Sequence, residues 1–294
     1  MRDHSPSLLT EFLNAKKHMA KIILPICLVS LLAWAGFWFM RGSTAGCADC
    51  IPLPDLSSLT ATMPPLSLPY PASPEPSAWK KLPATERLSD LEQRVKPSLK
   101  KELEKAGFKL GNSGYLRAFK ESRELELWLQ NDQQWQLFRT YPIAAASGRL
   151  GPKLMEGDGQ VPEGFYQITA KQLNPASNYH LAMNIGYPNA YDVHHERTGS
   201  LIMIHGSNVS IGCLAMTDPC IEEIYLIIES ALASGQSHIP THIFPFRMSS
   251  ERMQAAQEDP HYPFWKTLRP AYLKFEEQHQ PPKVKILGGG YEVN

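Results

Sequence analysis

The chain has 294 residues, 29 Lys and Arg against 29 Asp and Glu, and 43% hydrophobic residues. This length allows one sizeable core with an appendage, and the charged and aromatic content argues against wholesale disorder. The formal net charge of zero excludes the basic surface typical of nucleic-acid-binding proteins. The five cysteines match no zinc-binding spacing, since Cys47 and Cys50 form one C-x2-C pair without a second. We therefore expect neither a nucleic acid partner nor a metal site.

An apolar run near the N-terminus predicts a membrane anchor. Residues 22–40 hold 19 consecutive residues without a charge, enough to cross a bilayer as a helix. Basic residues cluster before this run, so the positive-inside rule places residues 1–21 in the cytoplasm. We expect a single-pass protein of the inner membrane whose remaining chain lies in the periplasm. The alternative is a signal peptide whose removal would release the chain into the periplasm, and a lipid on Cys47 is a weaker variant.

A proline-rich segment, residues 41–83, follows the apolar run. Nine prolines fall between Pro52 and Pro83, and no Lys or Arg occurs between Gly42 and Trp79. Such a composition predicts an extended spacer that would hold the rest of the protein away from the bilayer. A linker of low complexity without that role is the alternative.

The folded part is expected from Ala84 onward, with a helical lead-in over 84–112, a central domain over 113–248 and a C-terminal helical extension over 249–294. Apolar residues recur every three or four positions from Leu88 to Leu103, which predicts a helix that Pro97 interrupts. Asp218-Pro219 is typical of an N-cap followed by the first helical residue, so a second helix should run to about Ser234.

Alternation of apolar and polar residues on both sides of Asn131-Asp132 predicts a β-hairpin from about Leu125 to Tyr141. Further strands are predicted at Gly164–Thr169, Leu181–Ile185, Leu201–His205 and His238–Phe244. Strands that are separated from helices along a chain favour an α+β fold, here rich in β-structure.

The segment from Leu201 to Thr217 carries the strongest chemical signal. A buried strand ends at His205, a glycine-containing turn follows, and Cys213 lies just ahead of the predicted helix. A cysteine nucleophile needs a base, backbone N–H groups for an oxyanion, and exposure, all of which this arrangement can supply. On residue types alone the alternative is a buried cysteine with no catalytic role.

The segment H-G-S-N-V-S-I-G-C, residues 205–213, resembles the signature of the L,D-transpeptidase catalytic domain family (YkuD type). The resemblance extends over most of residues 113–282 and is closest to a subgroup of murein amidases that release a peptidoglycan-linked lipoprotein. Flanking blocks with the same resemblance are G-R-L-G-P-K (148–153), E-G-D-G-Q-V-P-E-G-F-Y (156–166), N-I-G-Y-P-N-A-Y-D (184–192), S-I-G-C-L-A-M-T (210–217) and F-P-F-R-M (244–248). The resemblance implies a β-rich peptidoglycan enzyme without a cofactor.

The resemblance also implies roles for individual residues. Cys213 would be the nucleophile that forms a thioester, His205 its general base, and the carbonyl of Gly206 the group that holds the imidazole. The backbone N–H groups of Ile211, Gly212 and Cys213 would form the oxyanion hole, with Ser210 supporting the loop.

Two departures from the family signature put transpeptidation in doubt. Ile211 stands where the signature has a second His, and the spacer between His205 and the cysteine motif is short. Both departures are similar to the amidase subgroup, and both alter the loop that shapes the acceptor side.

Four polar or charged residues in the flanking blocks are candidates for substrate binding. Lys153 and Arg247 could pair with carboxylates of a diaminopimelate-containing stem peptide, although surface ion pairs are an equal alternative. Asn184 and Asp192 could bind substrate amide or amine groups, or cap loops. His194 and His195 have metal-ligand residue types but are expected in a solvated loop.

Cys220 could form a disulfide, but we expect it to be buried. The Pro162-Glu163-Gly164 turn should be structural.

Three functions follow as hypotheses. The first is hydrolysis, in which Cys213 attacks a diaminopimelate carbonyl of a stem peptide and water resolves the thioester, releasing a lipoprotein or trimming the peptide. The second is transpeptidation, in which an amine resolves it. The third is a catalytically idle cell-wall-binding module, against which the His205–Cys213 pair argues.

Overall fold

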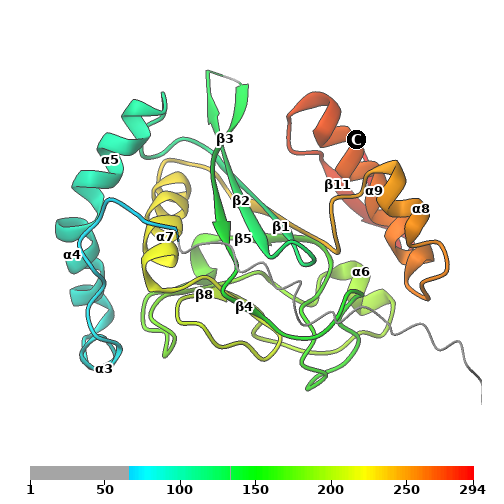
Figure 1. Cartoon of the computed structure of the whole chain (residues 1–294), viewed down its shortest axis with the longest axis horizontal. Coiled ribbons are helices and arrows are strands. Elements are labelled where there is room, and N and C mark those ends of the chain that lie inside the picture. The colour runs from blue at the N-terminus through cyan, green and yellow to red at the C-terminus, as the bar shows by residue number, and fades with distance from the viewer. Residues whose placement is uncertain (1–65, 133) are drawn as a thin grey trace, which may run out of the picture. The chain divides into compact units, whose positions relative to one another are not determined.

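The computed structural model describes residues 66–132 and 134–294, and two five-stranded sheets carry most of their core. Within these ranges no helix is both long and apolar enough to span a bilayer. The predicted anchor at 22–40, the segment at 1–21 and Cys47 lie outside the described residues. The mixed arrangement of sheets and helices confirms the predicted α+β class (Figure 1).

The first sheet has the strand order β3-β2-β1-β10-β5. Its strands are β3 (Gln134–Pro142), β2 (Glu124–Asn131), β1 (Gly114–Phe119), β10 (Ile239–Phe244) and β5 (Gly164–Ile168). The predicted hairpin is the antiparallel pair β2–β3, and β1 runs parallel to β10. β1 was not predicted, because its buried apolar, small and charged residues give no period-2 pattern.

The second sheet has the order β4-β9-β8-β7-β6 and consists of short strands. They are β4 (Ala145–Ala146), β9 (Leu214–Ala215), β8 (Met203–His205), β7 (Ala182–Asn184) and β6 (Leu173–Asn174). β8 and β9 are parallel neighbours, with His205 opposite Ala215. This pairing brings the segments of the predicted base and the predicted nucleophile together on adjacent internal strands of the sheet.

Helix α7 (Asp218–Ala233) lies in the main core and contacts strands of both sheets. The predicted helix is confirmed, but its cap is not the predicted one. Thr217, with a φ of 69°, is the N-cap, and Asp218 is the first helical residue. The Asp218 carboxylate instead accepts a hydrogen bond of 2.6 Å from the backbone N–H of Ser207.

The lead-in consists of α3 (Pro76–Trp79), α4 (Ala84–Arg94) and α5 (Lys96–Lys105), which lie beside α7 in Figure 1. The predicted interruption near Pro97 is confirmed as a break between α4 and α5. The prediction that the whole of 41–83 is an extended spacer is wrong for its C-terminal part. Residues Leu66, Leu68 and Tyr70 pack on the main core, and Trp79 is fully buried there.

Buried contacts tie this lead-in to the loop between β6 and β7. The guanidinium of Arg87 donates to the backbone carbonyls of Leu82, Lys80, Pro175, Ser177 and His180. The indole N–H of Trp79 donates to the carbonyl of His180 at 3.0 Å. A boundary at Ala84 would therefore cut through the folded unit, because described residues ahead of it pack on the main core.

The C-terminal part contains α8 (Ser250–Ala255), α9 (Tyr262–Gln278) and a hairpin of β11 (Val284–Leu287) and β12 (Gly290–Val293). The helices confirm the prediction for 249–278, but 284–293 is β-structure instead of helix. These elements cover the other face of the first sheet through a second apolar cluster that includes Phe119, Phe244 and Trp265. The remaining helical turns are η2 (Ala170–Gln172) and α6 (Ala190–His194).

Candidate active site

The parallel pair β8–β9 positions the two residues with the strongest predicted roles. His205 ends β8, and Cys213 immediately precedes β9, two residues before the Ala215 that pairs with His205. Side chains two residues apart in an extended strand share a face, and paired residues do so too. The backbone therefore directs the imidazole of His205 and the thiol of Cys213 toward the same face of the sheet.

The imidazole of His205 is held in one tautomer. Its Nδ1 lies 2.6 Å from the carbonyl oxygen of Gly206, an atom that can only accept a hydrogen bond. Nδ1 must carry the proton, which leaves the lone pair of the neutral ring on Nε2. Burial lowers the pKa of His205 below its usual value, an effect that the Gly206 carbonyl and Asp218 partly oppose. The ring is thus neutral near neutral pH and can accept a proton at Nε2.

Gly206 has no room for a side chain. A Cβ at this position would stand 2.7 Å from Oδ1 of Asp218, 2.8 Å from Cβ of His180 and 3.0 Å from Cγ2 of Ile221. Because the φ of Gly206 is ordinary, the glycine is needed here for close approach and not for a left-handed conformation. This close packing accompanies the contact between the Gly206 carbonyl and Nδ1 of His205.

The Cys213 thiol is partly buried, and its Sγ lies 3.7 Å from the carbonyl oxygen of Leu201. Burial raises the pKa of the Cys213 thiol above its usual value, while the backbone of Met203 and the charge of Lys153 act in the opposite direction. Both directions favour the uncharged groups, a thiol at Cys213 and a neutral imidazole at His205.

Two serine hydroxyls bind the backbone of the loop at residues 206–213, which ends at the predicted nucleophile and is called the nucleophile loop below. The N–H of Gly212 donates to Oγ of Ser147 at 2.5 Å, and the N–H of Cys213 donates to Oγ of Ser210 at 3.0 Å. Ser210 in turn donates to the carbonyl of Cys213 at 2.6 Å. Two of the three amides assigned to the oxyanion hole thus already have partners, while the third residue, Ile211, exposes 86% of its surface. The oxyanion role of these amides stays a prediction.

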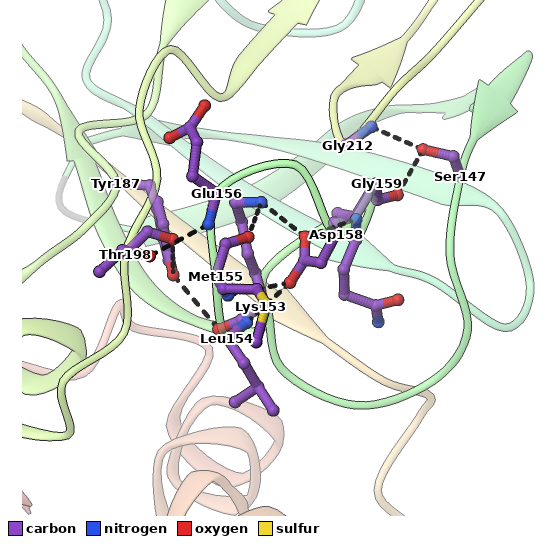
Figure 2. Close-up of polar contacts among 12 residues, drawn as sticks. Ser147, Lys153, Leu154, Met155, Glu156, Asp158, Gly159, Tyr187, Thr198 and Gly212 are labelled. Atoms are coloured by element: carbon purple, nitrogen blue, oxygen red, sulfur yellow. Dashed lines mark hydrogen bonds and ion pairs between the residues drawn. The ribbon is translucent and has the colours of Figure 1, made fainter. Parts of the chain in front are cut away.

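Ser147 was not predicted from the sequence. It follows β4, whose Ala146 pairs with Leu214, so the next step along the same register brings Ser147 opposite Cys213. A lone Ser in A-A-A-S-G-R has no distinguishing pattern, and only this strand pairing could have identified it. Its hydroxyl donates to the carbonyl of Gly159 at 2.7 Å, as Figure 2 shows, and so links the nucleophile loop to a second loop.

That second loop, residues 153–160, is built around Asp158. The ammonium of Lys153 pairs with Asp158 Oδ1 at 2.6 Å, and the backbone N–H groups of Leu154, Met155 and Gln160 donate to the same carboxylate. Burial alone would raise the pKa of Asp158, but these hydrogen bonds outweigh it and lower that pKa below its usual value. Figure 2 shows this cluster beside Ser147 and Gly212.

The predicted substrate-binding residues all have partners within the protein. Lys153 is buried against Asp158. Arg247 pairs with Glu124 and Glu126, each at 2.8 Å. The Asn184 side chain accepts from the N–H of Gly186 at 2.9 Å. These contacts match the alternative readings of ion pair and loop support, and substrate binding by the three residues stays a prediction.

The weaker candidates have structural contacts. Asp192 is fully buried, pairs with Arg197 at 2.8 Å and forms a capping box with Asn189. Within the described ranges no cluster of metal-ligating residues occurs, His194 and His195 included. Cys220 is buried and free among the described cysteines, as predicted.

The turn residue Glu163 is also fully buried. Its carboxylate accepts from the backbone N–H of Gly151 at 2.7 Å and the indole of Trp265 at 2.8 Å, and it pairs with Lys120 at 3.0 Å. These contacts agree with a structural turn.

Comparison with known proteins agrees with the motif analysis. The family described as L,D-transpeptidase catalytic domain (YkuD) matches residues 114–239. The chain is 43% identical over 185 residues to "Putative L,D-transpeptidase YafK" of Escherichia coli (strain K12), which covers 63% of this chain and 75% of that protein. The protein of the same name from Escherichia coli O157:H7 matches equally.

Among solved structures, a point-mutant form of the helical cell shape determining protein Pgp2 from Campylobacter jejuni has a TM-score of 0.38 and 21% identity. It covers 59% of this chain and 62% of its own. Bd1075 of Bdellovibrio bacteriovorus has a TM-score of 0.33 and 24% identity, over 54% of this chain and 58% of its own. The chain spans less than two thirds of either structure, and similarity this low supports no argument. The identity to YafK, with the matched catalytic domain, shows that this chain belongs to the YkuD family of L,D-transpeptidases.

Proposed function

We propose that the protein is a cysteine-dependent acyl-transfer enzyme that acts on diaminopimelate-containing stem peptides of peptidoglycan and uses water as the acceptor. The observation that carries the proposal is the tautomer of His205. Its Nδ1–H is bound to the Gly206 carbonyl, so Nε2 is the ring atom that can accept a proton, and the strand register directs the imidazole to the same sheet face as Cys213. An idle binding module would not require this arrangement.

In the first half-reaction, the proton of the Cys213 thiol moves to Nε2 of His205, and the sulfur attacks the carbonyl carbon at the L-centre of diaminopimelate. The resulting oxyanion takes over backbone N–H groups of Gly212 and Cys213 that now donate to hydroxyls. Collapse breaks the C–N bond, and the imidazolium of His205 delivers its proton to the departing amine. A thioester on Cys213 and a free amine result.

In the second half-reaction, His205 removes a proton from water as the water attacks the thioester carbonyl. The C–S bond breaks, and the proton returns to the Cys213 sulfur. The products are the regenerated thiol and a carboxylic acid, which releases the second proton of the water to solvent and becomes a carboxylate. Two features support water over an amine as the acceptor, namely Ile211 in place of the second signature His and the short spacer after His205.

For location, we propose that residues 22–40 anchor the chain in the inner membrane and that the catalytic domain works in the periplasm. A released periplasmic form is the alternative. A peptidoglycan-linked lipoprotein is the proposed macromolecular substrate, in keeping with the resemblance to the amidase subgroup.

The test is to incubate the full-length protein with defined tetrapeptide muropeptides and with lipoprotein-linked muropeptides, and to follow products by mass spectrometry. Release of the linked peptide that is lost in Cys213→Ala supports the hydrolase. Dimers joined through two diaminopimelate residues would instead establish transpeptidation. A folded protein that converts neither substrate would refute the catalytic proposal and favour the binding module.

A further inference from the structure

One aromatic side chain packs on the predicted base from the loop between β6 and β7, residues 175–181. The ring of Tyr179 has its centroid 4.9 Å from that of the His205 imidazole, with 39° between the two ring planes. His205 is only 3% exposed, whereas Tyr179 exposes 47% of its surface. Tyr179 thus covers a buried imidazole with one side and contacts solvent with the other.

The imidazole needs such a packing contact to keep its orientation. Its Nδ1 is held by the Gly206 carbonyl at 2.6 Å, and among the described residues the ring makes no other hydrogen bond. A base must be held to within a fraction of an ångström and a few degrees, by packing as well as by hydrogen bonds. The ring of Tyr179 is a side chain that packs on the imidazole in this way.

The loop that carries Tyr179 is held from its other side by the lead-in. Arg87 of α4 donates to the carbonyls of Ser177 and His180, and the indole N–H of Trp79 also donates to His180. The ring of His180 stacks on Trp79 with centroids 4.1 Å apart. Adjacent residues of the loop therefore pack in two directions, His180 on the lead-in and Tyr179 on the base.

The backbone of this loop has a conformation that depends on such support. His180 has a φ of 68°, in the left-handed region that a residue with a Cβ rarely occupies. The hydroxyl of Ser177 accepts a hydrogen bond of 3.0 Å from the N–H of Tyr179. These contacts set the direction in which the Tyr179 side chain leaves the loop.

The contact with Tyr179 also affects the charge of His205. Burial is the main cause that lowers the pKa of His205, and the ring of Tyr179 supplies part of that burial. The other titratable groups on the elements around β8 are Asp218 of α7, whose charge raises this pKa, Cys213 ahead of β9, and His180 of the loop. Without the phenol ring, water would reach the imidazole and stabilise its protonated form.

We propose that Tyr179 is a positioning residue, which holds the imidazole of His205 in place and keeps water from it. Its effect on turnover rests on the proposed function, whereas its effect on the imidazole rests on the contacts alone. Trp79 and Arg87 lie outside residues 114–239, so the lead-in of this chain supports the site from beyond the matched catalytic domain.

Titration of His205 tests the proposal without turnover. The full-length Cys213→Ala protein is labelled with ¹³C at Cε1 of its histidines, and the His205 signal is the one that disappears in a His205→Gln version. In Tyr179→Ala we expect this signal to titrate at a higher pH than in the parent protein, because the imidazolium gains hydration. Tyr179→Phe keeps the ring and should titrate as the parent does.

Turnover of a lipoprotein-linked muropeptide by proteins that retain Cys213 is the second readout. Tyr179→Ala should lower kcat at neutral pH by about tenfold with a smaller change in KM, and its activity should be lost at a higher pH as the pH falls. Tyr179→Phe should retain most of the activity. Tyr262→Ala, which removes a partly buried tyrosine packed on the second apolar cluster, should change neither readout.

The outcomes separate this inference from the proposed function. A His205 titration that is the same in Tyr179→Ala and its parent would overturn the positioning role, and so would a raised KM with unchanged kcat, which would make Tyr179 a substrate contact. If Tyr179→Ala does not fold, Ser177→Ala removes the hydroxyl bound to the Tyr179 N–H; we expect a shift in the same direction, and no shift would overturn the role. A shifted titration in a protein that converts no peptide would support the positioning of the imidazole and refute the proposed function.

Discussion

Removal of the Ser147 hydroxyl should impair both the stability and the chemistry of the nucleophile loop. This hydroxyl accepts from the N–H of Gly212 at 2.5 Å and donates to the carbonyl of Gly159 at 2.7 Å. Ser147→Ala loses two partly buried hydrogen bonds, each worth about 0.5–1.5 kcal/mol net. The expected cost is about 1–3 kcal/mol, which for a domain of this size lowers Tm by about 2–12 °C.

The catalytic effect follows from the conformation of Gly212. Its φ of 96° lies in the left-handed region, and the Ser147 contact fixes the amide next to the nucleophile. A misplaced Cys213 should lower kcat by about tenfold, or about 1.4 kcal/mol in the barrier, with a smaller change in KM. Stopped assays of peptide release, with Tm from circular dichroism, measure both quantities.

Two controls make this prediction decisive. Ser147→Thr keeps the hydroxyl and should recover most of the activity. Ser122→Ala removes a hydroxyl bound to Glu124 at an exposed position and should change neither Tm nor kcat. An unchanged or higher kcat in Ser147→Ala would refute the reasoning, because the hydroxyl would then be dispensable or would block the amide.

Three other perturbations have defined outcomes. Gly206→Ala places a Cβ 2.7 Å from Asp218, so we expect activity below a hundredth of wild type or an insoluble protein; near-normal kcat would show that the loop can move aside. Arg87→Ala leaves buried carbonyls unpaired and should cost at least about 3 kcal/mol, seen as a Tm lower by roughly 6–12 °C, whereas a shift under about 2 °C would mean that the lead-in is not integral. As the pH is lowered, activity should be retained until the pH reaches the lowered pKa of His205, where protonation removes the base. The rate of Cys213 alkylation should still increase above pH 9, because burial raises the pKa of the thiol. A plateau of the alkylation rate near pH 7 would indicate a preformed thiolate and contradict the neutral pair.

The raised pKa of the Cys213 thiol affects what its alkylation rate at neutral pH can show. If the resting pair is neutral, slow alkylation of Cys213 at neutral pH does not distinguish an enzyme from an idle module. In the proposed mechanism, proton transfer to His205 occurs as substrate binds, and turnover is the measurement that reports it.

Local patterns predicted much of the fold. The alternation around Asn131-Asp132 gave the hairpin β2–β3, and the spacing of leucines gave α4 and α5. The C-terminal hairpin was missed because Val284–Val293 follows a long helical segment and its residues are only partly buried. The order of strands in the two sheets could not be predicted. β1 pairs with β10, which lies far along the sequence, and no turn motif between β8 and β9 indicates that they pair.

The site was predictable where a side chain carries its own chemistry. Cys213 and His205 have reactive groups and a recognisable spacing, and the carbonyl of Gly206 lies 2.6 Å from Nδ1 of His205. The catalytic roles of these residues stay predictions. The contacts of Ser147 and of Trp79 depend on pairings between distant segments, namely β4 with β9 and the lead-in with the β6–β7 loop. The large sequence separation of their contacts also explains why composition alone predicts a spacer over residues 66–83. Their prolines suggest extended chain, but Tyr70 and Trp79 bind groups that lie far along the sequence.

The central claim is that Cys213 forms a thioester with a stem peptide that water then resolves. The most direct measurement is to incubate the full-length protein with a lipoprotein-linked muropeptide in water enriched in ¹⁸O, to quench the reaction rapidly, and to analyse protein and products by mass spectrometry. We predict a peptide adduct on Cys213, absent in Cys213→Ala, and one ¹⁸O atom in the released carboxylate. A released carboxylate without any adduct on Cys213, or products formed equally by Cys213→Ala, would contradict the account.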